Sequence, residues 1–167
     1  MRKSVIALAV VVGLVAGVAP SQAAKTQLTA TEKTYLKYLV EEEKLARDVY
    51  AYLAANVTSQ KFSNIVKSEQ THMDQVAALL KTYKVWNPTL VRKAGVFYDK
   101  ELQALYNELI AQGSVSVAAA FEVGVAIEEL DIADIEKMMR TPSPADIALV
   151  YSQLLKGSQN HLAAFSR

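Results

Sequence analysis

Apolar residues recur at spacings of three and four along most of this chain, and strict alternation of apolar and polar residues is rare. Such spacing places the apolar side chains on one face of an α-helix. The chain is also rich in Ala, Leu, Glu, Lys and Gln, which favour helices. The pattern predicts four long helices and one short one, over residues 32–56, 60–83, 100–112, 117–140 and 144–165.

Residues with capping chemistry mark two of the predicted helix starts. Thr29 and Glu32 have the spacing of a capping box before the first helix. Before the last helix we expect Ser143 to be the cap, with Pro144 at the first helical position and Asp146 completing the cap.

The lengths of the connections predict how the helices are arranged. Short links join the first long helix to the second and the third to the fourth, so each pair should form an antiparallel hairpin. The long connection contains a loop at 84–97 and the short helix, which Asp99 caps. A connection of this length can cross a whole bundle. We therefore predict an all-α, ferritin-like four-helix bundle with one long crossover that contains a short extra helix.

The N-terminal residues have the three parts of a secretory signal peptide. A basic start, Met1-Arg2-Lys3, precedes an apolar run over 5–18 and then small residues over 19–24. The apolar run is shorter than the roughly 20 residues that a membrane-spanning helix needs. We expect residues 1–23 to be a signal peptide, and residues 24–167 to form one exported domain in the periplasm or outside the cell, with no attachment to a membrane after cleavage.

Charge and cysteine content exclude several kinds of function. The 18 basic residues include Arg2 and Lys3, so 16 remain beyond the leader against 17 acidic residues. That balance, without a basic cluster, argues against a nucleic-acid partner. The chain contains no cysteine, which excludes disulfides, thiolate metal sites and thiol catalysis.

The inward-facing stripe of each long helix is apolar at both ends and becomes polar near or just past its middle. The polar positions, taken helix by helix, are Glu43; Glu69 with His72; Glu128 with Asp131; and Ser158 with His161. A buried carboxylate is costly unless a positive partner neutralises it. Because these stripes carry no Lys or Arg, a metal ion is the natural partner.

The candidate ligands are Glu43, Glu69, His72, Glu128, Asp131 and His161. Carboxylate oxygen and imidazole nitrogen suit iron, manganese or zinc. Four carboxylates and two imidazoles exceed the needs of one ion and match a carboxylate-bridged pair. The Glu69-x-x-His72 spacing is the sharpest signal, because it places both side chains on one helix face, one turn apart.

Several alternatives remain open at this level. A histidine in a core is often hydrogen-bonded and not a ligand. Glu43 has rivals in Glu41 and Glu42, and a run of three acidic residues is typical of a solvated face. Tyr50, Tyr83 and Tyr151 are expected to pack in the core and not to relay electrons. The pair Arg47 and Asp48 is expected either to support the ligands or to join helices.

These motifs resemble those of the ferritin-like di-iron carboxylate superfamily. Glu43-x-x-Ala46-Arg47-x-x-Tyr50 is similar to the first-helix motif of rubrerythrins, in which the glutamate is an iron ligand. The pairs Glu69-x-x-His72 and Glu128-x-x-Asp131 resemble the ligand pairs of the second and third rubrerythrin helices, with Asp in place of the second Glu. An uncharacterised ferritin-like family of bacteria and archaea is similar over essentially the whole mature chain. Its signatures resemble residues 41–50, 68–73, 127–132 and 157–162.

The fourth helix departs from the superfamily pattern. A Glu-x-x-His pair is expected there, but the first position is Ser158. Either Asp131 compensates for the lost ligand, or the site holds a single ion. The rubredoxin domain of rubrerythrins is also absent, since the chain has no cysteine. Repeated peroxide reduction would therefore need an external electron donor.

The resemblance and the polar stripes lead to three hypotheses of function. The first is a di-iron or di-manganese protein that acts on peroxide, oxygen or ferrous iron, as a non-haem oxidoreductase. The second is a metal-binding or stress-related helical bundle without turnover. The third is a polar network whose carboxyls are protonated and bind no metal. A homodimer is compatible with all three, whereas a ferritin-style cage is not expected.

Overall fold

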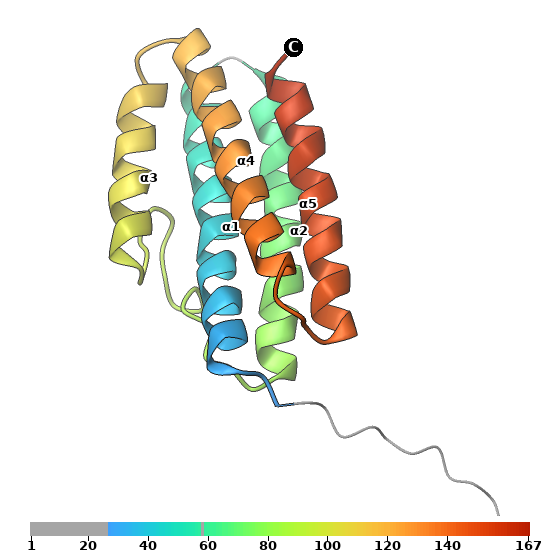
Figure 1. Cartoon of the computed structure of the whole chain (residues 1–167). Helices are drawn as coiled ribbons and strands as arrows, with labels where there is room; N and C mark the ends of the chain where they lie inside the picture. Colours follow the sequence, from blue (N-terminus) through green and yellow to red (C-terminus); the bar gives the residue numbers. More distant parts are fainter. Residues whose placement is uncertain (1–26, 58) are drawn as a thin grey trace, which may run out of the picture.

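The computed structural model describes residues 27–57 and 59–167, so the predicted signal peptide over residues 1–23 lies outside the described residues. The described part folds into five α-helices and contains no strand (Figure 1). No helix in this part combines the length and apolar character that crossing a membrane requires. The helices are α1 (Ala30–Asn56), α2 (Gln60–Thr82), α3 (Lys100–Gly113), α4 (Val117–Met139) and α5 (Ala145–Phe165).

The four long helices form a bundle of two antiparallel hairpins, α1 with α2 and α4 with α5 (Figure 1). Helices α2 and α4 run in the same direction, so the connection between them must return along the length of the bundle. Helix α3 lies within this connection, outside the bundle, and packs against α1 and α4. The predicted all-helical bundle with a long connection containing a short helix is confirmed.

The start of α1 has the predicted capping box. The side-chain oxygen of Thr29 accepts from the Glu32 backbone N–H at 3.2 Å, and the Glu32 carboxylate accepts from the Thr29 N–H at 2.6 Å. These bonds satisfy two backbone donors that the first helical turn leaves without partners.

The predicted cap of α5 was wrong. Pro144 has ψ 147°, which is extended, so it precedes the helix and α5 begins at Ala145. The hydroxyl of Ser143 donates to the Thr141 carbonyl and caps no helical N–H. The physical reason is that Ser143 is one residue too far from the true first turn to reach its N–H groups.

The core consists of two apolar clusters with the polar positions between them. One cluster surrounds Tyr50, Phe62 and Phe165, whose rings pack with centroids 5.2–6.0 Å apart. The other surrounds Leu36 and Ile135 near the opposite end of the bundle. Because both ends of the core are apolar, the acidic and imidazole groups are enclosed in a layer that water does not reach freely.

The acidic run at the middle of α1 is buried, which corrects the expectation of a solvated face. Glu41 is 2% exposed, and its carboxylate accepts from the backbone N–H groups of Tyr98 and Asp99. Lys44 is also buried and forms an ion pair with Asp48. These contacts attach the long connection to α1, so this segment of α1 serves both the connection and the bundle interior.

Candidate metal centre

The structure brings five of the six predicted ligands into two overlapping groups of three. Glu43, Glu69 and His72 form one group, and Glu69, Glu128 and His161 form the other. Within each group, one potential ligand atom from each residue lies within 4.8 Å of the others, and all of these residues are buried. Glu69 belongs to both groups. The arrangement is that of two adjacent cation positions that share one carboxylate.

The carboxylate of Glu69 faces one imidazole with each of its oxygens. Oε2 lies 3.0 Å from Nδ1 of His72, and Oε1 lies 2.7 Å from Nδ1 of His161. Each imidazole also faces a second acid, with Glu43 3.3 Å from His72 and Glu128 3.5 Å from His161. All four helices of the bundle therefore supply the two groups, as the stripes predicted.

Two neighbouring residues fix how the imidazoles are oriented. Nε2 of His161 lies 3.0 Å from the hydroxyl of Ser68, which leaves Nδ1 to face the acids. A Cβ atom at Gly157 would lie 2.4 Å from Nε2 of His72, so the glycine leaves the space that this ring needs. Sequence reasoning assigned neither role. The signal was present only as the positions of Ser68, directly before Glu69, and of Gly157 on the histidine-bearing α5.

Asp131 is the predicted ligand that lies outside both groups. It accepts a short hydrogen bond from the hydroxyl of Ser158, whose oxygen is also 3.1 Å from the Leu154 carbonyl oxygen. The other oxygen of Asp131 is buried and has no hydrogen bond among the described residues. Ser158 thus holds Asp131 beside the centre, at the position where a fourth-helix glutamate was expected.

Several buried oxygens of the centre lack a hydrogen-bond donor. Among the described residues, neither oxygen of Glu43 has a hydrogen bond. Burial, Asp131 and Glu69 together raise the pKa of Glu43 well above its usual range. Burial likewise raises the pKa of Asp131 to about 8, although the Ser158 hydrogen bond opposes the rise. Acids that must hold protons in the absence of a cation, with free lone pairs, fit the donor set of a metal ion.

The pKa values of the shared carboxylate and of one imidazole shift so that the charged form of each group is favoured. Burial acts to raise the pKa of Glu69, but hydrogen bonds from His161 and His72 outweigh it and lower the pKa to about 2. Burial acts to lower the pKa of His161, but its bonds to Glu128 and Glu69 raise it to about 10. Glu69 is therefore ionised at neutral pH, and His161 carries the proton that a metal ion would displace.

Tyr50 contacts the centre, and Arg47 links two helices of the bundle. The hydroxyl of Tyr50 donates to Oε1 of Glu128 at 2.7 Å, so this ring both packs in the core and orients a candidate ligand. Arg47 donates to Gln70 on α2 at 2.8 Å and to Asp48. The open choice for Arg47 is thereby settled: it joins α1 to α2.

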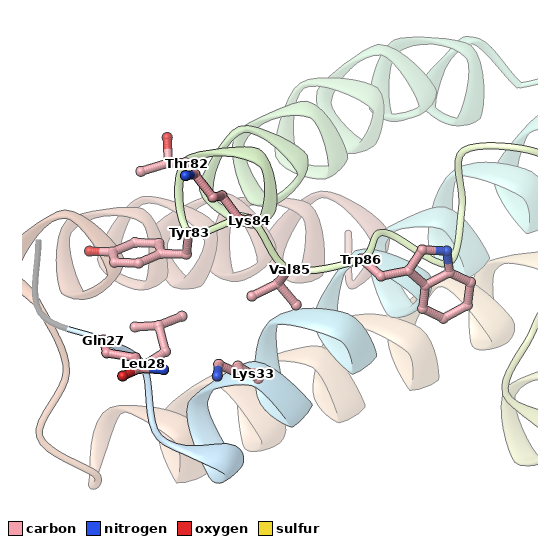
Figure 2. Close-up of a pocket in the computed structure, with 8 residues that line it drawn as sticks. All are labelled: Gln27, Leu28, Lys33, Thr82, Tyr83, Lys84, Val85 and Trp86. Carbon is pink, nitrogen blue, oxygen red and sulfur yellow. The ribbon is translucent and has the colours of Figure 1, made fainter.

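A pocket of about 680 Å³ lies at one end of the bundle, away from the centre (Figure 2). It is formed where the chain enters α1 and leaves α2, and no candidate ligand lines it. Its lining residues are Gln27, Leu28, Lys33, Thr82, Tyr83, Lys84, Val85 and Trp86. The candidate centre is therefore defined by its buried acids and imidazoles and not by this pocket.

Comparison with known proteins places the chain in a family. It is 45% identical over 143 residues to the Uncharacterized protein MJ0754 of Methanocaldococcus jannaschii. The matched segment covers 86% of this chain and 77% of the relative. The crystal structure of the hypothetical protein MJ0754 from Methanococcus jannaschii matches with a TM-score of 0.83 and 44% identity, over 87% of this chain and 83% of the other. Residues 32–167 match the model of an uncharacterized protein domain, DUF2202, and the chain therefore belongs to the DUF2202 family.

Proposed function

We propose that this protein is a ferritin-like metal-binding protein whose bundle holds two iron or manganese ions, with zinc as a competitor. The observation that carries the proposal is the pair of ligand groups that share Glu69. Its two oxygens face different imidazoles, which is the arrangement that a bridging carboxylate needs. The parallel course of α2 and α4, joined by the long connection, supports the ferritin-like arrangement.

The residues would hold the ions in two positions. Glu43 and His72 would supply one, Glu128 and His161 the other, and both would share Glu69. Asp131, with one oxygen free of hydrogen bonds, stands beside the pair as a further oxygen donor or a proton acceptor. Ser68 fixes the ring of His161, and Tyr50 fixes the carboxylate of Glu128. Such outer partners tune the affinity of the ligands they hold.

A bound iron or manganese pair supplies one-electron or two-electron redox chemistry toward oxygen, peroxide or ferrous iron. The chain's own part is to exclude water from the layer, to orient the ligands and to hold protons. In the metal-free protein Asp131 is protonated near neutral pH, because burial raises its pKa to about 8. It is therefore placed to deliver or accept a proton beside the centre.

A second candidate function is metal binding without turnover. Ser158 favours it, because this hydroxyl holds Asp131 by a hydrogen bond at the position expected for a metal-binding glutamate. The two positions then share one carboxylate, Glu69, and lack the second one that the fourth helix was expected to supply. Steady consumption of oxygen or peroxide by the iron-loaded protein, with a reductant supplied, would reject this alternative.

The test is the metal-to-protein ratio of the purified protein, measured by elemental analysis. About two ions per chain are expected from the two ligand groups, and about one would indicate that only one of the two positions fills. The variants Glu69→Ala and His72→Ala should lose bound metal, whereas Glu129→Ala, a change at an exposed acid on α4, should not. Metal content unchanged by Glu69→Ala would reject the shared site.

We also propose that the protein is exported, on the basis of the leader-like residues 1–23. The mass of the intact protein recovered from its native cells tests this directly. Cleavage after Ala23 or Ala24 is expected. A protein that keeps Met1 and remains with the cytoplasmic fraction would reject export without affecting the metal site.

A further inference from the structure

A second pair of acids lies just outside the candidate metal centre. Burial is the main cause of the raised pKa of Glu42 on α1, and the nearby carboxyl groups of Asp131 and Asp134 on α4 add to it. Glu42 is 3% exposed, and neither of its oxygens receives a hydrogen bond from a donor in the described residues. Ionised carboxylates have no donor to offer each other, so a proton or a cation must lie between them.

The outer member of this pair reaches the protein surface. The side chain of Asp134 is 21% exposed and lines a surface pocket of about 290 Å³ between α1 and α4. Tyr38, Glu101 and Lys137 line the same pocket. Two acids against one lysine make its mouth attractive to a cation that arrives from solvent.

The inner member of the pair faces the candidate metal centre. Asp131 is the largest electrostatic influence on Glu42 after burial, and it is also the largest such influence on Glu43. Asp131 has one buried oxygen without a hydrogen bond. The acids Asp134, Glu42 and Asp131 therefore link the pocket with the centre.

We propose that Glu42 and Asp134 form a binding site for a divalent cation, through which ions pass from the surface pocket by way of Asp131 to the buried centre. The inference rests on the proposed metal-binding function and adds the route by which the centre is filled. A shared proton would neutralise one of the two acids, whereas a divalent cation neutralises both. All-oxygen ligands at a partly hydrated position favour a hard ion such as Mn²⁺ or Fe²⁺. Such a site would hold the ion weakly enough for it to pass to the centre.

Lys137 opposes this route. Its ammonium group lies 3.7 Å from Oδ1 of Asp134, and its side chain is 66% exposed. It therefore competes with an incoming cation for the outer acid. Loss of its charge should speed the entry of ions, which is the opposite of the effect expected at Glu42 or Asp134.

The test is the rate at which Co²⁺ enters metal-free protein, followed by stopped-flow absorbance of the ligated ion. Glu42→Gln and Asp134→Asn should each slow entry by about tenfold, the lower end of known electrostatic effects on association. The number of ions held at the buried centre should stay that of the wild type. Lys137→Gln should speed entry several-fold, and Glu129→Gln, which removes an exposed charge from the same helix, should have no comparable effect.

The outcomes separate this inference from the proposed function. If wild-type protein binds no Co²⁺, the metal centre itself is wrong. If it binds Co²⁺ and both Glu42→Gln and Asp134→Asn fill at the wild-type rate, the centre stands and the entry site is rejected. Asp134 is partly exposed, so its variant remains informative if Glu42→Gln fails to fold. A crystal soaked in Mn²⁺ should show anomalous density between Glu42 and Asp134, and a proton shared by the pair would leave none.

Discussion

At the scale of single residues, the hydrogen bond between Ser68 and His161 determines which nitrogen of the ring faces the acids. Nε2 lies 3.0 Å from the serine hydroxyl, which leaves Nδ1 toward Glu69 and Glu128. Ser68→Ala removes this partner, and we expect metal affinity at the His161 position to fall about tenfold or more. Competitive titration with Co²⁺ or Mn²⁺ measures the change. Ser152→Ala, an exposed serine on α5, is the control and should bind as the wild type does.

The ring of His72 packs closely against Gly157 on α5. A methyl group at position 157 would lie 2.4 Å from Nε2 of the ring, which is closer than packed atoms approach. Gly157→Ala should therefore displace His72 and weaken the ion held with Glu43, while the His161 position keeps its ion. The expected result is a fall in bound metal from two ions toward one. Unchanged stoichiometry and affinity would show that α5 moves aside without cost.

The candidate ligands could be predicted from sequence because polar residues interrupt otherwise apolar stripes at one level. What could not be predicted is the direction of each side chain. Asp131 lies on the correct stripe but turns to Ser158 and stays outside both ligand groups. Glu41 and Glu42 lie beside Glu43 and are buried, because they meet the long connection and α4. Helical spacing carries no information on such contacts between distant segments.

At the scale of elements, a buried ion pair within α1 holds the long connection, because each of its members forms a hydrogen bond with the backbone of that segment. Lys44 and Asp48 are 1% and 4% exposed, and Lys44 also donates to the Lys93 carbonyl at 2.9 Å. Asp48→Ala leaves the ammonium group buried without its acid, which should cost about 3–5 kcal/mol in the free energy of unfolding. Urea denaturation measures it. The double variant Lys44→Met, Asp48→Leu should recover much of the loss, because no buried charge remains.

The sequence predicted the number and order of the helices more accurately than the residues at which they begin and end. Long apolar stripes with helix-forming residues indicated the four long helices, and Asp99 marked the start of α3, where its carboxylate accepts from the Glu101 and Leu102 N–H groups. The start of α5 was misplaced because Pro144 suits two neighbouring positions at a helix N-terminus. Its observed ψ, which places it before the helix, depends on the path of the turn from α4 and not on the residue alone.

At the scale of the whole molecule, the centre couples metal binding to stability and to pH. Burial raises the pKa of Asp131 from 3.8 to about 8, and the pKa values of Glu43 and Glu128 are raised as well. In the metal-free protein Asp131 holds a proton that the unfolded chain releases, and the raised pKa values of Glu43 and Glu128 act in the same direction. The folded state therefore binds more protons than the unfolded state between about pH 4 and pH 8, so its stability falls as pH rises through this window.

The pKa shifts of His161 and Glu69 do not reverse that sign. The pKa of His161 rises from 6.5 to about 10, so this group also loses its stabilising effect as pH increases. The pKa of Glu69 falls to about 2, and the stability gained from it is complete once the pH exceeds the range in which an ordinary glutamate titrates, so it no longer changes above about pH 5.5. Metal-free protein should thus show a melting temperature that declines from about pH 5.5 to pH 8.

Metal-loaded protein should behave differently over the same range. Ions bind the deprotonated ligands, so affinity increases with pH, and a ligand that binds only the folded state raises stability as its affinity increases. The difference in melting temperature with and without Mn²⁺ should therefore widen from pH 5.5 to pH 8, when measured by scanning calorimetry at fixed ion concentration. Glu69→Ala, which removes the shared ligand, should largely abolish that difference. A metal-free melting temperature that rises with pH would contradict the protonated acids, and a constant difference would show that metal does not displace their protons.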